Sequence, residues 1–133
     1  MEKLSASSRP PVHVLATESD IVTGLALSVE HQNPAIAAML LEELERAEVH
    51  EGISLPRDAV TLGSRVTFVD ERTLRMQDVE LVLPGQANIA DGKISILTPM
   101  GAALYGLREG AVIDWPDRTG AERKIRVTRV VQP

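Results

Sequence analysis

Three histidines are the first candidates for metal binding or acid–base chemistry in this sequence, which contains no cysteine. His13, His31 and His50 lie 18 and 19 residues apart, so no two of them have the short spacing that places paired imidazoles on one helix face. The absence of cysteine also excludes disulfides and thiolate metal sites. We therefore expect three separate, exposed histidines, no metal site and no cofactor.

Other catalytic patterns are missing too. Glu42 and Glu43 are adjacent, so on a helix their carboxylates point in different directions and cannot act as an acid–base pair. No glycine-rich run carries the Lys–Ser/Thr of a phosphate-binding loop, and no serine lies in a nucleophile elbow. The sequence predicts no catalytic residue and therefore a protein that is not an enzyme.

A binding surface is better supported, in the segment ISILTPMGAALYGLREG at residues 94–110. Thr98 followed by Pro99 is typical of a helix start, because the hydroxyl caps free backbone N–H groups and proline has no N–H to lose there. The same pattern also fits a turn that only plugs one end of a sheet. In both cases the aliphatic side chains should face the core, namely Ile96, Leu104 and Leu107.

Two amphipathic helices are predicted ahead of this segment. Residues 17–20 offer capping side chains and first-turn acids, and apolar residues then recur at helical spacing. Asn33 and Pro34 cap and begin a second helix, which Gly52 ends. Helices joined by so short a connection pack antiparallel. The apolar run at 12–15 fits either an added strand or a packing segment.

The remaining chain is typical of short strands. Runs rich in β-branched residues occupy 60–70, 79–83, 94–97, 112–115 and 125–131, with a turn at 117–122 before the last. Short connections predict an antiparallel sheet, and hence an α+β fold with its helices at the N-terminus. Alternation in the last run sorts its residues into two faces: Ile125, Val127 and Arg129 on one, Arg126, Thr128 and Val130 on the other.

Composition and charge narrow the function classes. The 133 residues suit one domain, or one domain plus a small appendage, and no apolar run approaches the roughly 18 residues of a membrane span. Residues 1–52 carry a net charge of −6 and residues 53–133 one of +1, which indicates two parts with different surroundings. The overall charge of −5 and the low aromatic content argue against a protein that binds nucleic acid directly.

Four segments, in this order, resemble a known family: LLEELERAEV (40–49), LPRDAVTLGSRVTFVD (55–70), VELVLPGQAN (79–88) and LTPMGAALYGLREGAVIDWP (97–116). They are similar to the C-terminal module of the Gre transcript-cleavage factors and, more closely, to the Rnk family, named as regulators of nucleoside diphosphate kinase. The resemblance covers residues 12–131. It implies a short antiparallel coiled coil (12–52) and an FKBP-like antiparallel β domain with one short helix (53–133). The Ser, Arg and Pro content of residues 1–11 separately indicates a disordered tail.

The resemblance also implies a function in transcription. Proteins of this family dock on RNA polymerase at the rim of the secondary channel, and their coiled coil points inward. The docking segment corresponds here to Leu97, Thr98, Pro99 and Met100, where Leu97 replaces a residue that is polar in Gre factors. The coiled-coil tip corresponds to Glu30, His31, Gln32 and Asn33.

The tip differs from that of a cleavage factor. Gre factors use two acidic tip residues to hold the catalytic Mg²⁺, whereas Glu30 is the only carboxylate here, and the helices are shorter. The resemblance therefore predicts a cytoplasmic regulator of transcription elongation that occupies the channel without stimulating cleavage and competes with Gre factors. It would contact DNA only through the polymerase complex and would not bind membranes.

Two other classes of protein stay open. An FKBP-like fold suggests a prolyl isomerase, although Phe68, Tyr105 and Trp115 are the only aromatic residues available to line its pocket. A helical hairpin also suggests an oligomerising module. The sequence does not decide whether a link to nucleoside diphosphate kinase is direct contact or gene regulation.

Overall fold

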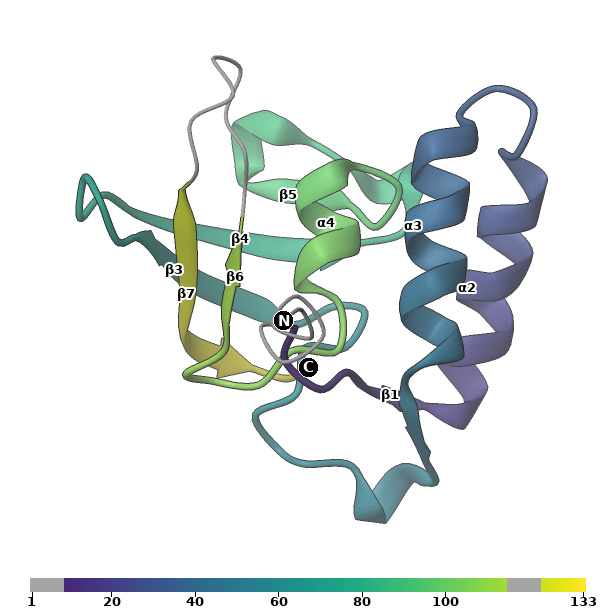
Figure 1. Cartoon of the computed structure of the whole chain (residues 1–133), viewed down its shortest axis with the longest axis horizontal. Coiled ribbons are helices and arrows are strands. Elements are labelled where there is room, and N and C mark those ends of the chain that lie inside the picture. Colours follow the sequence, from purple (N-terminus) through teal and green to yellow (C-terminus); the bar gives the residue numbers. More distant parts are fainter. Residues whose placement is uncertain (1–8, 115–122) are drawn as a thin grey trace, which may run out of the picture.

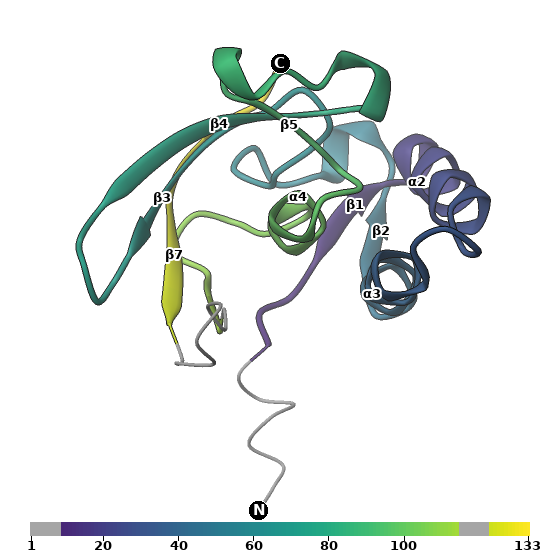
Figure 2. The same ribbon diagram turned by 90° about the horizontal axis from the view of Figure 1, so that it is seen from above.

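The computed structural model describes residues 9–114 and 123–133. Two helices pack beside a mixed sheet, and a short third helix lies between this helical pair and the sheet (Figures 1 and 2). The predicted α+β class is confirmed. Most of the predicted tail at 1–11, Trp115 and the predicted turn at 117–122 lie outside the described residues. Within the described residues, no helix has the length and apolar character needed to cross a lipid bilayer.

The two N-terminal helices are α2 (Ala16–Ser28) and α3 (Pro34–Glu45), which lie side by side (Figure 1). Asn33 caps α3 as predicted, because its side-chain oxygen accepts a hydrogen bond of 3.3 Å from the Ile36 N–H. The capping prediction for α2 is wrong. Its N-cap is Leu15, which has no side-chain acceptor, because the chain enters the helix directly from a strand. Residues buried between these helices and the core are Val22, Ala26, Ile36, Ala37 and Leu40.

The prediction that Gly52 ends the second helix is also wrong. The helix stops at Glu45, and β2 (Glu48–His50) runs parallel to β1 (His13–Leu15). The Glu48 N–H donates to the Val12 carbonyl at 2.8 Å, so the strand partner of this segment comes from far away in the sequence. The run at 12–15 is thus a strand. A 3-10 turn, η1 (Gly52–Ser54), follows β2.

The main sheet has five strands in the order β5-β4-β3-β7-β6. Its β4 and β5 strands are parallel, so the predicted antiparallel sheet is wrong for this pair. The chain between them forms the 3-10 turns η2 (Pro84–Gln86) and η3 (Ile89–Asp91). This longer connection carries the chain back along β4, so β5 runs in the same direction as β4. The strands are β3 (Arg65–Asp70), β4 (Met76–Val82), β5 (Lys93–Ser95), β6 (Val112–Asp114) and β7 (Lys124–Val131).

A β-bulge changes which side chains of β7 face the core. Thr67 pairs with Arg129 and Phe68 with Val127, so Thr128 has no partner across the ladder. Beyond this extra residue the alternation shifts by one. Val130 is therefore buried and Arg129 exposed, and the faces predicted for these two residues are wrong.

Helix α4 (Pro99–Leu104) packs its backbone closely against the end of β5. A Cβ atom on Gly101 would lie only 2.1 Å from the Ser95 carbonyl oxygen, so a side chain at this position would push the helix away from the strand. The predicted core residues of this segment, Ile96, Leu104 and Leu107, are each at most 2% exposed. The core thus holds the start of α4 in one place against the sheet.

Candidate functional site

The start of α4 is a rigid turn held by side-chain hydrogen bonds. The Thr98 hydroxyl donates to the Ser95 carbonyl at 2.7 Å and accepts from the Gly101 N–H at 3.1 Å. The Leu97 N–H donates to the Ser95 hydroxyl oxygen at 2.9 Å. Both hydroxyl side chains are therefore used inside the turn, and Thr98 acts as the predicted helix cap.

The four residues predicted to bind a partner are adjacent but not equally accessible. Pro99 is exposed, while Leu97, Thr98 and Met100 are half-buried. Leu97 and Met100 also pack against the hydrophobic core. Pro99 is thus the member of this set that projects furthest into solvent, and a partner would meet its ring on a preformed helix start.

The turn between α2 and α3 forms the free end of the helical pair (Figure 1). Glu30, His31, Gln32 and Asn33 are all exposed there. Asn33 is already engaged as the cap of α3, and its backbone N–H donates to the Val29 carbonyl at 2.7 Å. Glu30 provides the only carboxylate in this turn.

A polar contact that the sequence did not predict joins the helical pair to the sheet domain. Glu18 of α2 accepts hydrogen bonds of 3.2 Å from the Tyr105 hydroxyl and 3.2 Å from the Leu62 N–H. Burial raises the pKa of Glu18, an effect that the two hydrogen bonds oppose. Burial, together with the nearby Glu18 charge, also raises the pKa of Tyr105. These residues lie far apart in the sequence, so no local pattern could have paired them.

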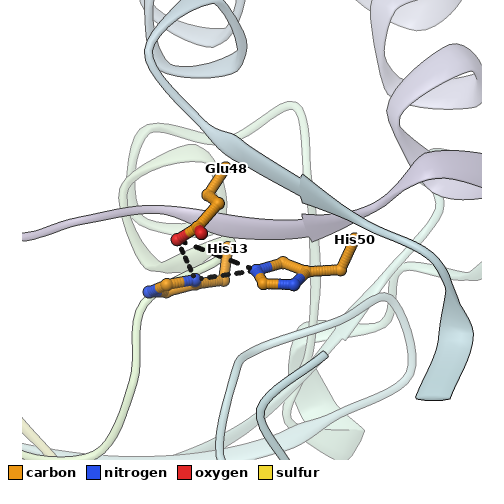
Figure 3. Close-up of side chains that lie close together, drawn as sticks. All are labelled: His13, Glu48 and His50. Carbon is orange, nitrogen blue, oxygen red and sulfur yellow. Dashed lines mark hydrogen bonds and ion pairs between the residues drawn. The ribbon is translucent and has the colours of Figure 1, made fainter. Parts of the chain in front are cut away.

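The structure also brings together three potential metal ligands, His13, Glu48 and His50 (Figure 3). The His13 Nδ1 atom lies 3.0 Å from His50 Nε2 and 3.3 Å from Glu48 Oε1. The two imidazole side chains are only 12% and 13% exposed. The prediction of separate, exposed histidines is therefore wrong for this pair, whereas His31 is exposed in the α2–α3 turn, apart from them.

The signal for this cluster was present in the sequence but incomplete. Glu48 and His50 are two residues apart, the spacing that puts side chains on one face of a strand. That spacing is informative only once residues 48–50 are known to form a strand rather than the end of a helix. The parallel register, with His13 opposite Glu48 and Leu15 opposite His50, then completes the cluster.

A hollow between α3, α4 and β6 contains no aromatic ring. Phe68 and Tyr105 are buried in the core at 2% and 3% exposure. The described residues therefore offer no open pocket lined with aromatic side chains, which a prolyl isomerase of the FKBP kind would need. The hollow is lined by Arg9, Pro10, Met39, Glu43, Arg46, Ala103, Leu107, Ile113 and Asp114.

Comparison with known sequences confirms the family resemblance. The family model described as "Transcription elongation factor, GreA/GreB, C-term" matches residues 55–132. The "Regulator of nucleoside diphosphate kinase" of Escherichia coli (strain K12) is 32% identical over 108 residues, which cover 81% of this chain and 79% of that protein. A "Transcription elongation factor GreA" from Nitrobacter hamburgensis is 31% identical over 101 residues, or 76% of this chain and 63% of that protein.

Comparison with solved structures extends the similarity to the fold. The "Prokaryotic transcription elongation factor GreA/GreB from Nitrosomonas europaea" superposes with a TM-score of 0.74 at 30% sequence identity. The superposition covers 92% of this chain and 98% of that one, so it extends beyond the residues matched by the family model.

Proposed function

The chain belongs to the GreA/GreB C-terminal family and is related to the regulators of nucleoside diphosphate kinase; on that premise we propose that it regulates transcription elongation by docking on RNA polymerase at the rim of the secondary channel. In this proposal residues 53–133 form the FKBP-like docking domain and residues 12–52 form a coiled coil that points into the channel. A polymerase partner would place the protein in the bacterial cytoplasm, with DNA contacted only through the polymerase complex.

The start of α4 carries this proposal. It belongs to the region matched by the family model, and its conformation is set before any partner arrives, by the Thr98 cap and the close packing of Gly101 on Ser95. A preformed surface loses little conformational entropy on binding, which favours affinity. The exposed ring of Pro99 then offers an apolar contact for the polymerase rim.

The α2–α3 turn supports a regulator that does not stimulate transcript cleavage. The helices have 13 and 12 residues, so each is about 20 Å long. Mg²⁺ is usually held through carboxylate oxygens together with substrate phosphates, and Glu30 alone supplies half of the acidic pair. The protein would occupy the channel mouth, exclude Gre factors and supply no catalytic residue of its own.

A charge placed at Pro99 tests the docking surface. Pro99→Glu keeps the helix start, because an acidic residue is favourable in the first turn of a helix. We expect its affinity for core polymerase to fall at least about tenfold, or about 1.4 kcal/mol. Ile53→Glu is the matched control, since it adds the same charge at a side chain that is 100% exposed elsewhere. Equal binding by Pro99→Glu and the wild type would remove the α4 start from the interface.

Transcript cleavage tests the role of the turn. In stalled elongation complexes the protein alone should leave the cleavage rate unchanged, and it should slow cleavage by added GreA in a concentration-dependent way. Pro99→Glu should lose that inhibition. Gln32→Glu adds a second carboxylate to the turn and should still give no cleavage if helix length limits reach. Stimulation of cleavage by the wild-type protein would refute the proposed role.

A further inference from the structure

We propose that His13, Glu48 and His50 form a binding site for one divalent transition-metal ion, with zinc the best match. Two imidazoles and one carboxylate are a recurrent ligand set for zinc. The residues come from two strands that pair in parallel, so the backbone fixes their relative positions. Nothing in the proposed docking on polymerase uses these side chains.

The spacing of the ligand atoms fits a small ion. His13 Nδ1 lies 3.0 Å from His50 Nε2 and 3.3 Å from Glu48 Oε1 (Figure 3). The distance from His50 Nε2 to Glu48 Oε1 is 3.9 Å. Three atoms at these separations lie on a circle with a radius of about 2.0 Å, which matches zinc–nitrogen and zinc–oxygen bond lengths of about 2.0–2.2 Å. An ion could therefore sit among all three atoms with little movement of the backbone or side chains.

The surrounding hydrogen bonds prepare His50 for coordination. The Ser54 hydroxyl donates to the Glu51 carbonyl at 2.9 Å, so its oxygen is left to accept from the His50 Nδ1–H at 3.4 Å. That tautomer leaves the lone pair of Nε2 directed at the site. Partners of this kind orient metal-binding histidines in many proteins. When the ion binds, the proton of the His13 ring would move from Nδ1 to Nε2. This move frees the Nδ1 lone pair for the ion and leaves the charge of the ring unchanged.

The exposure of the three groups gives the ion both a route and a vacant coordination position. The imidazoles are largely covered, whereas the Glu48 side chain is 66% exposed. The ion can enter along the carboxylate, and water can complete a tetrahedral shell. Nitrogen ligands favour zinc and its neighbours in the transition series over Mg²⁺ and Ca²⁺, which prefer oxygen.

Occupancy would fasten the base of the helical pair. His13 precedes α2 and His50 follows α3, so one ion would join the strands at both ends of this unit. The His13 N–H also donates to the Gly106 carbonyl at 2.8 Å, which connects β1 to the loop after α4. Metal binding would thus restrain the helical pair relative to the segment that begins at Pro99.

Zinc titration of the untagged full chain tests the site. Competition with a chromophoric zinc chelator should give one ion per chain, and Mg²⁺ in excess should not displace it. His50→Gln should weaken zinc binding at least about tenfold, the lower range seen even for outer-shell changes. His31→Gln is the matched control and should bind zinc like the wild type. Zinc should also raise the melting temperature of the wild type and of His31→Gln, and that of His50→Gln by clearly less.

A second variant protects the test against misfolding. Glu48→Gln changes a mostly exposed side chain, so it should fold normally and still bind zinc more weakly. Imidazole ¹⁵N resonances should shift at His13 Nδ1 and His50 Nε2 when zinc is added. The proposal would be overturned if Glu48→Gln and His50→Gln both bound zinc as tightly as the wild type does. It would also be overturned if His31→Gln lost as much zinc affinity as those two variants.

Discussion

Glu18→Ala should loosen the connection between the helical pair and the sheet domain. The change removes the acceptor of two hydrogen bonds, one from the Tyr105 hydroxyl and one from the Leu62 N–H. Tyr105 is only 3% exposed, so its hydroxyl would lose its partner inside the protein rather than gain water. An unsatisfied buried group of this kind costs about 1–3 kcal/mol.

The expected loss of stability can be converted into a melting temperature. We take about 2 kcal/mol, near the middle of that range, because the half-buried Leu62 N–H can bond to water in the variant. Unfolding entropy is about 2.1 cal/mol/K per residue, so for 133 residues this loss corresponds to a decrease of about 7 °C. Thermal and denaturant unfolding monitored by circular dichroism would measure it.

A double-mutant cycle isolates the contact between the two side chains. Tyr105→Phe removes the hydroxyl while keeping the ring in the core. Glu18→Ala should cost about 1–2 kcal/mol less in the Tyr105→Phe background, because no hydroxyl is then left without a partner. Losses that add within about 0.5 kcal/mol would show that the two residues are not energetically coupled and would refute the reasoning.

The pH dependence of the same variant has a defined sign. Burial is the main reason that the pKa of Glu18 is raised, so the folded chain binds this proton more tightly than the unfolded chain. The stabilisation from Glu18 is therefore fully present below its unfolded pKa of about 4.3 and declines as the pH rises through the folded value. The stability difference between wild type and Glu18→Ala should be larger near pH 4 than near pH 8.

Three further substitutions test the packing of α4 and an ion pair of the sheet. Gly101→Ala should destabilise the fold by about 1–3 kcal/mol, because its Cβ would meet the Ser95 carbonyl oxygen at 2.1 Å. Gly24→Ala in α2 should instead stabilise the fold by about 0.5–1 kcal/mol, because a Cβ atom there would meet open space. Equal effects of the two alanine substitutions in denaturant unfolding would contradict the packing argument. The hydrogen bonds from Arg123 are the main reason that the pKa of Asp70 is lowered. The stabilisation of the fold by the Asp70 carboxylate is therefore present above its unfolded pKa of about 3.9, and it is lost as the pH falls through the lowered value. Asp70→Asn should therefore be less stable than wild type at pH 7, with a gap that narrows below about pH 4; a gap independent of pH would exclude the ion pair as its cause.

Local chemistry accounts for the elements that the sequence predicted correctly. Thr98 and Pro99 form the predicted cap and first turn of α4, since both effects depend only on neighbouring backbone groups. Asn33 and Pro34 begin α3 for the same reason. The alternation of β3, with Val66 and Phe68 buried, likewise follows from the geometry of a single strand.

Most of the incorrect predictions depend on how separate elements pair with one another. Residues 48–50 continue a helical pattern in the sequence, but in the structure they pair with β1 as a strand, through hydrogen bonds that begin at Val12. The bulge at Thr128 is defined only by the register of β7 against β3. The parallel pairing of β4 with β5 is decided by where η2 and η3 return the chain.

The sequence alone was enough to predict the α+β class, the family, the position of the proposed docking segment at 97–100 and the single carboxylate of the α2–α3 turn. Only the folded structure shows which of the four proposed docking residues is exposed, because the core beneath them covers Leu97 and Met100 and leaves Pro99 outside. It also brought His13 to His50 and Glu18 to Tyr105. Side-chain contacts between strands and helices depend on the register and packing of whole elements, and residue spacing along one chain cannot encode them.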